Sequence, residues 1–307
     1  MEDKYPVDHK EAMILFEKIT KKSVVQIERC SIGIANYVFM VSTAIEKFIL
    51  RCSKDEQAYK DTVYWLNKLS VCEIPIPIVL SEGKYKDYSY LILSYIPGDD
   101  IGKVYYKLND SQKKQIAREV VEIQRKVSKV DISTDSEWTW NSVVDETLDR
   151  AEERIERKHY FDVNKIQIIK NLQRELQEYL DQVRPTPYLD DISTKNLLVY
   201  EGKVSGMIDI DWMGFGDILT FVAMTRVALL NMDLDTRYID YLLDEMQPNT
   251  MEHKAFVFYC LMFCVDFMGE RGMQFLDKTI PVNESIIRRL NDIFDMLMEE
   301  WNKCCER

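Results

Sequence analysis

The sequence predicts an α+β fold of two lobes, a small β-rich N-terminal lobe and a larger, mainly helical C-terminal lobe. Three observations predict it. Short runs of β-branched and aromatic residues dominate the chain before a Pro97-Gly98 break. Helical spacing of apolar residues dominates after that break. One pair of short apolar strands, at 197–200 and 204–208, interrupts the helices. We therefore expect lobe boundaries at residues 1–97 and 98–307.

The N-terminal lobe is expected to hold one amphipathic helix at 8–22 before its first strands. Gly and Asn in the segment 31–36 supply turn chemistry between two of the strands. Ser53 is a candidate N-cap for a helix over 54–69, and the two prolines of 74–80 make that segment extended. The expected strands are 24–27, 37–42, 47–52 and 89–98.

The C-terminal lobe is expected to begin with a helix that Asn109 or Asp110 caps and that runs to about Val130. Asn164 can cap a later helix, and the segment 219–230 is apolar on most faces, which indicates a buried helix. The other expected helices are 146–158, 165–182, 234–246, 251–268 and 284–303. This order indicates one continuous lobe and no internal repeat.

Charge and cysteine usage narrow the class of function. Forty basic residues against 52 acidic ones give a net charge of −12, which disfavours non-specific nucleic-acid binding and tolerates a cationic small substrate. The seven cysteines lack paired metal-ligand spacing, so reduced thiols are expected and a zinc site is not. The charged N-terminus and the absence of a long apolar run predict a cytoplasmic protein without a membrane partner.

The stretch from Tyr188 to Asp217 carries the chemistry. Asp191 and Asn196 precede the first strand of the pair, and Asp209 follows the second. The start of one strand and the end of its antiparallel partner are neighbours, so we expect these polar groups to converge. Carboxylate and amide oxygens suit Mg²⁺, which indicates a metal-and-phosphate site.

The motif DISTKN…GKVSGMID resembles the aminoglycoside phosphotransferase family, which shares the protein-kinase fold. The family pattern is His-Gly-Asp, four variable residues, Asn, two strands around a Gly turn, Ile-Asp, and then Gly-Asp. The chain matches it at Asp191, Asn196, Ile208-Asp209 and Gly216-Asp217. The resemblance covers nearly the whole chain, but only the 188–217 stretch is specific. It implies a bilobal kinase fold that uses ATP or GTP with Mg²⁺.

The resemblance assigns roles to the residues of this stretch. Asp191 is implied as the catalytic carboxylate at the acceptor hydroxyl. Asn196 and Asp209 are implied as Mg²⁺ ligands. Asp211 competes with Asp209 for the metal, and spacing favours Asp209. Asp217 is expected to hold the loop after the second strand.

In the N-terminal lobe the resemblance implies the nucleotide contacts. Arg51 stands where kinases carry the Lys on the phosphates, with Lys47 as the reserve candidate. The family's Glu partner on the helix is replaced by Tyr59 here, and Glu56, one turn earlier, is its candidate substitute. Further nucleotide contacts are implied for Gly33, in the loop over the phosphates, and for the backbone from Ser94 to Ile96, which would bond adenine.

Two departures from the family pattern stand out. Leu189 replaces the family's His and Asp190 its Gly, so the loop before Asp191 loses the hydrogen bonds of an imidazole. After Gly216-Asp217, the family's second Asp is Phe221.

The leading interpretation is a kinase that phosphorylates a hydroxyl of a small molecule, with an aminoglycoside or a related antibiotic as the family-level acceptor. The acidic helical segments 143–158 and 234–246 suit a polycationic sugar, but solvated helix faces explain them as well. A metabolic kinase of choline, ethanolamine, homoserine or a sugar is the alternative. Trp138, Trp140 and Trp212 are candidate walls for a quaternary ammonium. A pseudoenzyme that binds a nucleotide without catalysis is a further alternative. We expect a monomer or a dimer.

Overall fold

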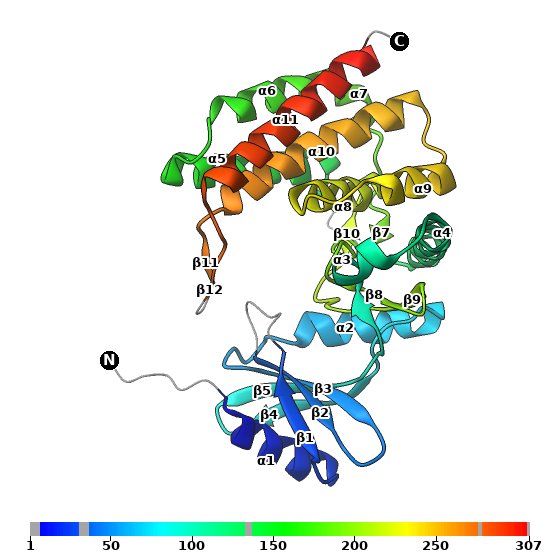
Figure 1. Ribbon diagram of the computed structural model, residues 1–307, viewed down its shortest axis with the longest axis vertical. Coiled ribbons are helices and arrows are strands. Elements are labelled where there is room, and N and C mark those ends of the chain that lie inside the picture. Colours follow the sequence, from blue (N-terminus) through cyan, green and yellow to red (C-terminus); the bar gives the residue numbers. More distant parts are fainter. Residues whose placement is uncertain (1–6, 31–36, 133–136, 276–277, 306–307) are drawn as a thin grey trace. The chain divides into compact units, whose positions relative to one another are not determined.

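The computed structural model describes residues 7–30, 37–132, 137–275 and 278–305, and the fold is α+β (Figure 1). The chain forms two compact units. The first unit contains the chain up to Pro97 together with Ser205–Trp212 and Phe275–Lys278. The second contains Gly98–Val204, Met213–Gln274 and the chain from Thr279 onward. Most of the second predicted strand, 204–208, and the residues just after it therefore belong to the first unit, although they lie far from that unit's other residues in sequence.

A five-stranded antiparallel sheet forms the centre of the first unit, in the order β1-β2-β3-β5-β4 (Figure 1). Its buried face, with Phe39, Val41 and Leu50, packs against Leu15 and Phe16. These two residues lie on helix α1 (His9–Thr20), whose N-terminus is capped by the Asp8 side chain. The strands are β1 (Gln26–Arg29), β2 (Tyr37–Ser42), β3 (Lys47–Ser53), β4 (Val79–Tyr85) and β5 (Tyr88–Ser94).

Helix α2 (Lys60–Leu69) and a 3-10 turn, η1 (Ser70–Cys72), follow β3. The helix begins six residues later than predicted, because residues 54–59 form turns and the Ser53 hydroxyl accepts from the Asp55 amide instead of capping a helix. Between η1 and β4, the Pro75 carbonyl accepts from the Met207 amide at 2.9 Å. That bond joins β9 (Lys203–Met207) to the extended proline segment of the first unit.

The remaining strands are short, and some of them include residues of both units. β6 (Asp99–Asp100), β8 (Leu197–Tyr200) and β9 form a three-stranded sheet in the order β6-β8-β9. β7 (Pro187–Tyr188) pairs antiparallel with β10 (Gly214–Phe215). The remaining short elements are α3 (Ile101–Val104), η2 (Tyr105–Lys107), β11 (Gln274–Phe275) and β12 (Lys278–Thr279).

The helices of the second unit pack around α10, which is buried on nearly all faces and contacts α5, α8 and α11 (Figure 1). A helix that is apolar all round needs such a covering of neighbours. The helices are α4 (Asp110–Val127), α5 (Trp140–Lys158), α6 (Asn164–Glu175), α7 (Gln177–Leu180), α8 (Leu219–Asn231), α9 (Arg237–Met246), α10 (Thr250–Glu270) and α11 (Glu284–Cys305). Within the described residues, none of the helices has the length and apolar character needed to cross a bilayer.

Candidate active site

The loop between β7 and β8 places Asp191 at the surface of the second unit. Leu189 and Ile192 are buried on either side of it, 2% and 4% exposed, whereas Asp191 is exposed. This alternation anchors the loop in the core and presents one carboxylate to solvent. The two flanking side chains of the loop are therefore packed in the core, and the Asp191 side chain is exposed.

Asn196, at the end of the same loop, orients Asp191. Its side-chain amide nitrogen donates to the Asp191 backbone carbonyl and to the Asp191 carboxylate, both at 2.9 Å. The Ser193 hydroxyl donates to the other carboxylate oxygen at 3.2 Å. Because the side-chain nitrogen of Asn196 donates to Asp191, the side-chain carbonyl oxygen is the Asn196 atom that could bind a cation. The predicted neighbourhood of Asp191 and Asn196 is therefore present.

Two further contacts hold this loop in place. The Gly102 amide donates to the Thr194 carbonyl at 2.9 Å, and a Cβ at Gly102 would lie 2.8 Å from that oxygen. Only glycine permits so close an approach of α3 to the loop. Gln124, on α4, bonds the backbone of Leu189. The sequence did not predict a role for Gly102 or Gln124, because both lie far from the loop along the chain.

In the first unit, Arg51 on β3 is buried and held by Asp211. Its two terminal nitrogens donate to the two Asp211 carboxylate oxygens at 2.7 Å each, a bidentate pair. The Thr62 hydroxyl, on α2, donates to Asp211 at 2.7 Å. Burial opposes charge on both partners, but these bonds outweigh it: the pKa of Arg51 rises and the pKa of the Asp211 carboxyl falls. Both side chains are therefore charged at neutral pH.

Asp209 lies beside this pair but is bound more loosely. Its carboxylate is 3.4 Å from the Arg51 guanidinium and its side chain is 53% exposed. Burial of the remaining part raises the pKa of the Asp209 carboxyl, against the charge of Arg51. Its backbone is in the left-handed region, at φ 61°. Asp211 thus has its oxygens engaged by Arg51 and Thr62, and Asp209 has exposed oxygens that fit a hard cation.

The expected partner of Arg51, Glu56, lies elsewhere. Glu56 precedes α2, is exposed and pairs with Lys84 at 2.7 Å. The helix contributes Thr62 instead, through Asp211. Lys47, the reserve candidate, is also exposed and stacks over the Tyr95 ring at 5.3 Å. Asp211 therefore holds Arg51, in place of the predicted Glu56.

The segment after β5 was predicted to meet adenine. The Ser94 amide donates to the Ile78 carbonyl at 3.0 Å, and the Ser94 hydroxyl accepts from the Ile78 amide at 2.8 Å. The Ser94 amide and hydroxyl are thus engaged with the segment before β4. Gly33 lies outside the described residues.

A buried hydrogen-bond network fixes the chain after β10. The Asp217 carboxylate accepts from the Tyr179 hydroxyl at 2.6 Å and from the Tyr259 hydroxyl at 2.9 Å. Trp140 donates to the Tyr259 hydroxyl at 2.8 Å. Asp217 thus holds the loop before α8, and Phe221, where the family has Asp, is core at 1% exposure. Trp140 is also part of this core, so of the three candidate aromatic walls it is unavailable to a ligand.

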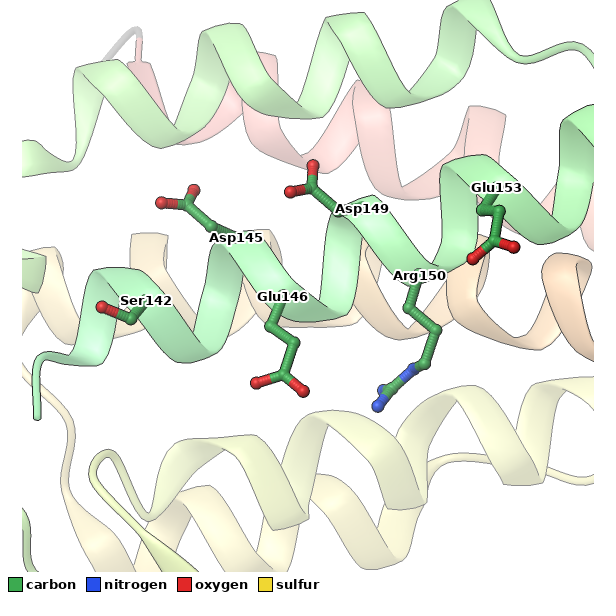
Figure 2. Close-up of a pocket in the computed structure, with 6 residues that line it drawn as sticks. All are labelled: Ser142, Asp145, Glu146, Asp149, Arg150 and Glu153. Carbon is green, nitrogen blue, oxygen red and sulfur yellow. The ribbon is translucent and has the colours of Figure 1, made fainter.

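The acidic residues of α5 line an open groove of about 660 Å³, together with Ser142 and Arg150 (Figure 2). Asp145 and Asp149 point to one side of the helix, and Glu146 and Arg150 to the other (Figure 2). Asp145 accepts from Gln173 and Asp149 from Lys170, both on α6. Asp145 and Asp149 are therefore engaged in hydrogen bonds between α5 and α6. These bonds make the groove a less suitable site for a polycation.

The two units together have the fold of the protein-kinase-like small-molecule kinases. The chain belongs to the phosphotransferase enzyme family, whose model matches residues 26–255. The apo structure of a thermostable mutant of aminoglycoside phosphotransferase APH(4)-Ia is similar, with a TM-score of 0.65 at 17% identity over 95% of this chain and 97% of that one. ADP-bound APH(2'')-Ib has a TM-score of 0.64 at 15% identity over 96% of this chain and 99% of that one.

One curated relative is a probable ketoamine kinase of Staphylococcus aureus (strain NCTC 8325 / PS 47), 23% identical over 187 residues. The match spans 56% of this chain and 63% of the relative. The chain therefore covers less than two thirds of that protein's length. A further variant of this thermostable APH(4)-Ia was solved in a ternary complex with ADP and hygromycin B.

Proposed function

We propose that the protein is a kinase that transfers the γ-phosphoryl group of ATP or GTP to a hydroxyl of a small molecule. The observation that carries this proposal is the Asp191–Asn196 pair, in which a buried amide orients an exposed carboxylate at 2.9 Å. A general base needs to lie within hydrogen-bond reach of the hydroxyl from which it takes a proton. Asp191, on a loop anchored by buried neighbours, suits that role, because it can orient the acceptor hydroxyl and receive its proton.

Asn196 and Asp209 are the residues that would hold Mg²⁺. Within the described part of the chain, no cluster of three His, Cys, Asp or Glu side chains could bind a metal by itself. Mg²⁺ at kinase sites is commonly held by one or two protein oxygens together with phosphate oxygens and water, which agrees with so small a donor set. When bound, the ion neutralises the charge of the phosphates. The exposed Asp209 carboxylate and the Asn196 carbonyl oxygen support this assignment.

The first unit supplies the proposed nucleotide contacts and the second the catalytic loop. Arg51 is always charged and remains the proposed contact of the phosphate oxygens, although both of its terminal nitrogens bond Asp211 in this structure. The backbone from Ser94 to Ile96 remains the proposed partner of the nucleotide base, and Gly33 remains the proposed residue of the phosphate loop.

Two comparisons suggest a class of acceptor for the proposed kinase: the similar solved structures and the curated relative. Similar structures are of aminoglycoside phosphotransferases, one solved with hygromycin B and one with streptomycin and ATP. The relative described as a probable ketoamine kinase favours instead a hydroxyl-bearing sugar amine. The α5 acids are engaged by α6, so this helix gives little support to a polycationic antibiotic. A sugar amine with a single charge is therefore the second candidate.

A screen of nucleotide consumption tests the function. The protein is incubated with ATP or GTP and Mg²⁺ and with aminoglycosides, macrolides, amino-alcohols or sugar ketoamines. Turnover well above background hydrolysis with one class supports the kinase and identifies its acceptor. If no compound raises turnover above background while nucleotide binding is retained, a pseudoenzyme is the correct description.

Asp209→Ala tests the metal assignment separately. The wild-type protein should melt at a higher temperature with nucleotide and Mg²⁺ than with nucleotide and EDTA, and Asp209→Ala should lose that difference. A Mg²⁺-dependent shift of the wild-type size in the variant would remove Asp209 from the metal site.

A further inference from the structure

Gln124 is a fully buried polar side chain on α4. It is 0% exposed and lies among the core residues Val120, Val121 and Val127. Its amide nitrogen donates to the Leu189 carbonyl at 2.7 Å, and its carbonyl oxygen accepts from the Leu189 amide at 2.9 Å. Both ends of one side chain thus bind the backbone of one residue.

Burial of a side-chain amide without hydrogen-bond partners is unfavourable. Gln124 avoids this loss only while the backbone of Leu189 stays in one position and one orientation. A donor and an acceptor on one planar group also fix a peptide segment more strictly than a single bond does. The pair therefore acts as a two-point clamp between α4 and the chain after β7.

The clamped residue is two positions before Asp191. Leu189 is itself buried and has no side-chain group that can hydrogen-bond, so its side chain supplies packing alone. Within β7, directly before Leu189, Tyr188 pairs with Gly214 and accepts from the Thr220 hydroxyl at 2.7 Å. Gln124 thus supplies a polar contact that fixes the backbone where the exposed part of the loop begins.

We propose that Gln124 is a positioning residue of the Asp191 loop, which it restrains from α4 through two hydrogen bonds to the backbone of Leu189. The inference rests on the proposed kinase function for its catalytic consequence. It rests on geometry alone for its structural consequence, that the clamp restrains residues 189–196. Gln124 touches no reacting atom, so it acts through the placement of Asp191.

Gln124→Met tests the proposal, since Met is close in volume and lacks both hydrogen bonds. Gln173→Met is a matched control: Gln173 is a buried glutamine of the second unit, 8% exposed, that donates to Asp145 at 2.7 Å away from the loop. Amide hydrogen exchange of both variants and the wild type, without ligands, measures the restraint. We expect exchange in residues 189–196 to be about tenfold faster in Gln124→Met than in Gln173→Met.

Steady-state kinetics with the acceptor found by the screen give the second readout. We expect kcat of Gln124→Met to fall by about 10- to 100-fold with KM for the nucleotide unchanged, because misplacement of a catalytic group reduces the chemical step. Gln173→Met should keep both values.

Equal exchange of the loop in the two variants would overturn the proposal, whether or not the protein is a kinase. Faster exchange in Gln124→Met with an unchanged kcat would overturn the positioning role. If exchange in residues 189–196 is faster in Gln124→Met than in Gln173→Met but the wild-type protein turns over no acceptor, the proposed function is overturned and the clamp is supported.

Discussion

At the scale of single residues, the buried charge of Arg51 is stabilised by an acid that is distant in sequence. Asp211 supplies both carboxylate oxygens, and Thr62 fixes that carboxylate from α2. A buried guanidinium needs such pairing, because removal of one partner leaves an uncompensated charge. The structure thus gives Asp211 a positioning role and leaves Asp209 as the acid with exposed oxygens.

Asp211→Asn should weaken nucleotide binding. The change replaces one of the two acceptor oxygens by an amide nitrogen that cannot accept from Arg51. Loss of a charge-assisted bond is worth about 1.5–3 kcal/mol, so the Kd for Mg²⁺-ADP should rise by roughly 10- to 100-fold. Titration calorimetry measures it. Glu56→Gln is the control, and a larger effect there than at Asp211 would restore Glu56 as the partner of Arg51.

Asp235→Asn should destabilise the second unit in a pH-dependent way. Asp235 pairs with the buried Lys113 ammonium at 2.9 Å. Burial opposes the Asp235 charge, but the bond from Lys113 prevails and lowers the pKa of this carboxyl. Its contribution is therefore complete above the ordinary Asp pKa of about 3.9 and is lost as pH falls through the lower folded-state value.

The expected loss for Asp235→Asn is about 1–3 kcal/mol at pH 7, kept modest because the Asp235 side chain is 43% exposed. Urea unfolding of wild type and variant at pH 7 and at a series of pH values falling from about 4 to about 2 measures the difference. The gap between the two proteins should shrink as the pH falls through this range. A gap that widens on acidification would contradict the assigned pairing.

At the scale of elements, one buried network joins four separate segments of the second unit. Trp140 begins α5, Tyr179 lies on α7, Tyr259 on α10 and Asp217 just before α8. All meet at the Asp217 carboxylate or through the Tyr259 hydroxyl. Burial raises the pKa of Asp217, and the hydroxyl donors oppose that rise. This network fixes the start of α8 relative to α5 and α10.

Tyr259→Phe tests the network without a change of shape. The variant removes a donor from Asp217 and leaves the buried Trp140 nitrogen without its acceptor, which should cost about 1–3 kcal/mol. Tyr179→Phe removes one donor but leaves Trp140 paired, so its loss should be smaller. Denaturant unfolding of both variants checks the order, and a larger loss for Tyr179→Phe would show that the Trp140 bond is unimportant.

The elements that the sequence predicted best have strong local signals. The strand 197–200 is bounded by a Gly-containing turn, and the predicted Asn109 cap forms with Gln112 as its capping-box partner. β4 was missed, because its residues after Leu80 are mostly polar and follow a proline segment. The break between α6 and α7 at Leu176 has no Gly or Pro to signal it. Such features depend on tertiary packing rather than on local propensity.

At the scale of the whole molecule, the resemblance predicted the family and the α+β fold correctly. It also identified Asp191, Asn196 and Asp209 as candidates, because their spacing within one short stretch is itself the signal. The residues that support them were not predictable in this way. Gln124 is 65 positions from Leu189, and Thr62 is 149 positions from Asp211. A single sequence contains no mark that such distant residues meet.

The same limit applies to the acceptor. Similar structures contain aminoglycosides, whereas the curated relative is described as a probable ketoamine kinase. The central claim, transfer of a phosphoryl group with Asp191 at the acceptor hydroxyl, does not depend on the choice between them.

Asp191→Asn tests that claim most directly. The substitution keeps the shape of the side chain and an acceptor for Asn196 but removes the base. With the acceptor from the screen, kcat should fall by about 10²- to 10⁴-fold, while the rise in melting temperature on addition of Mg²⁺-ADP stays as in the wild type. A variant that keeps the wild-type kcat would contradict the account.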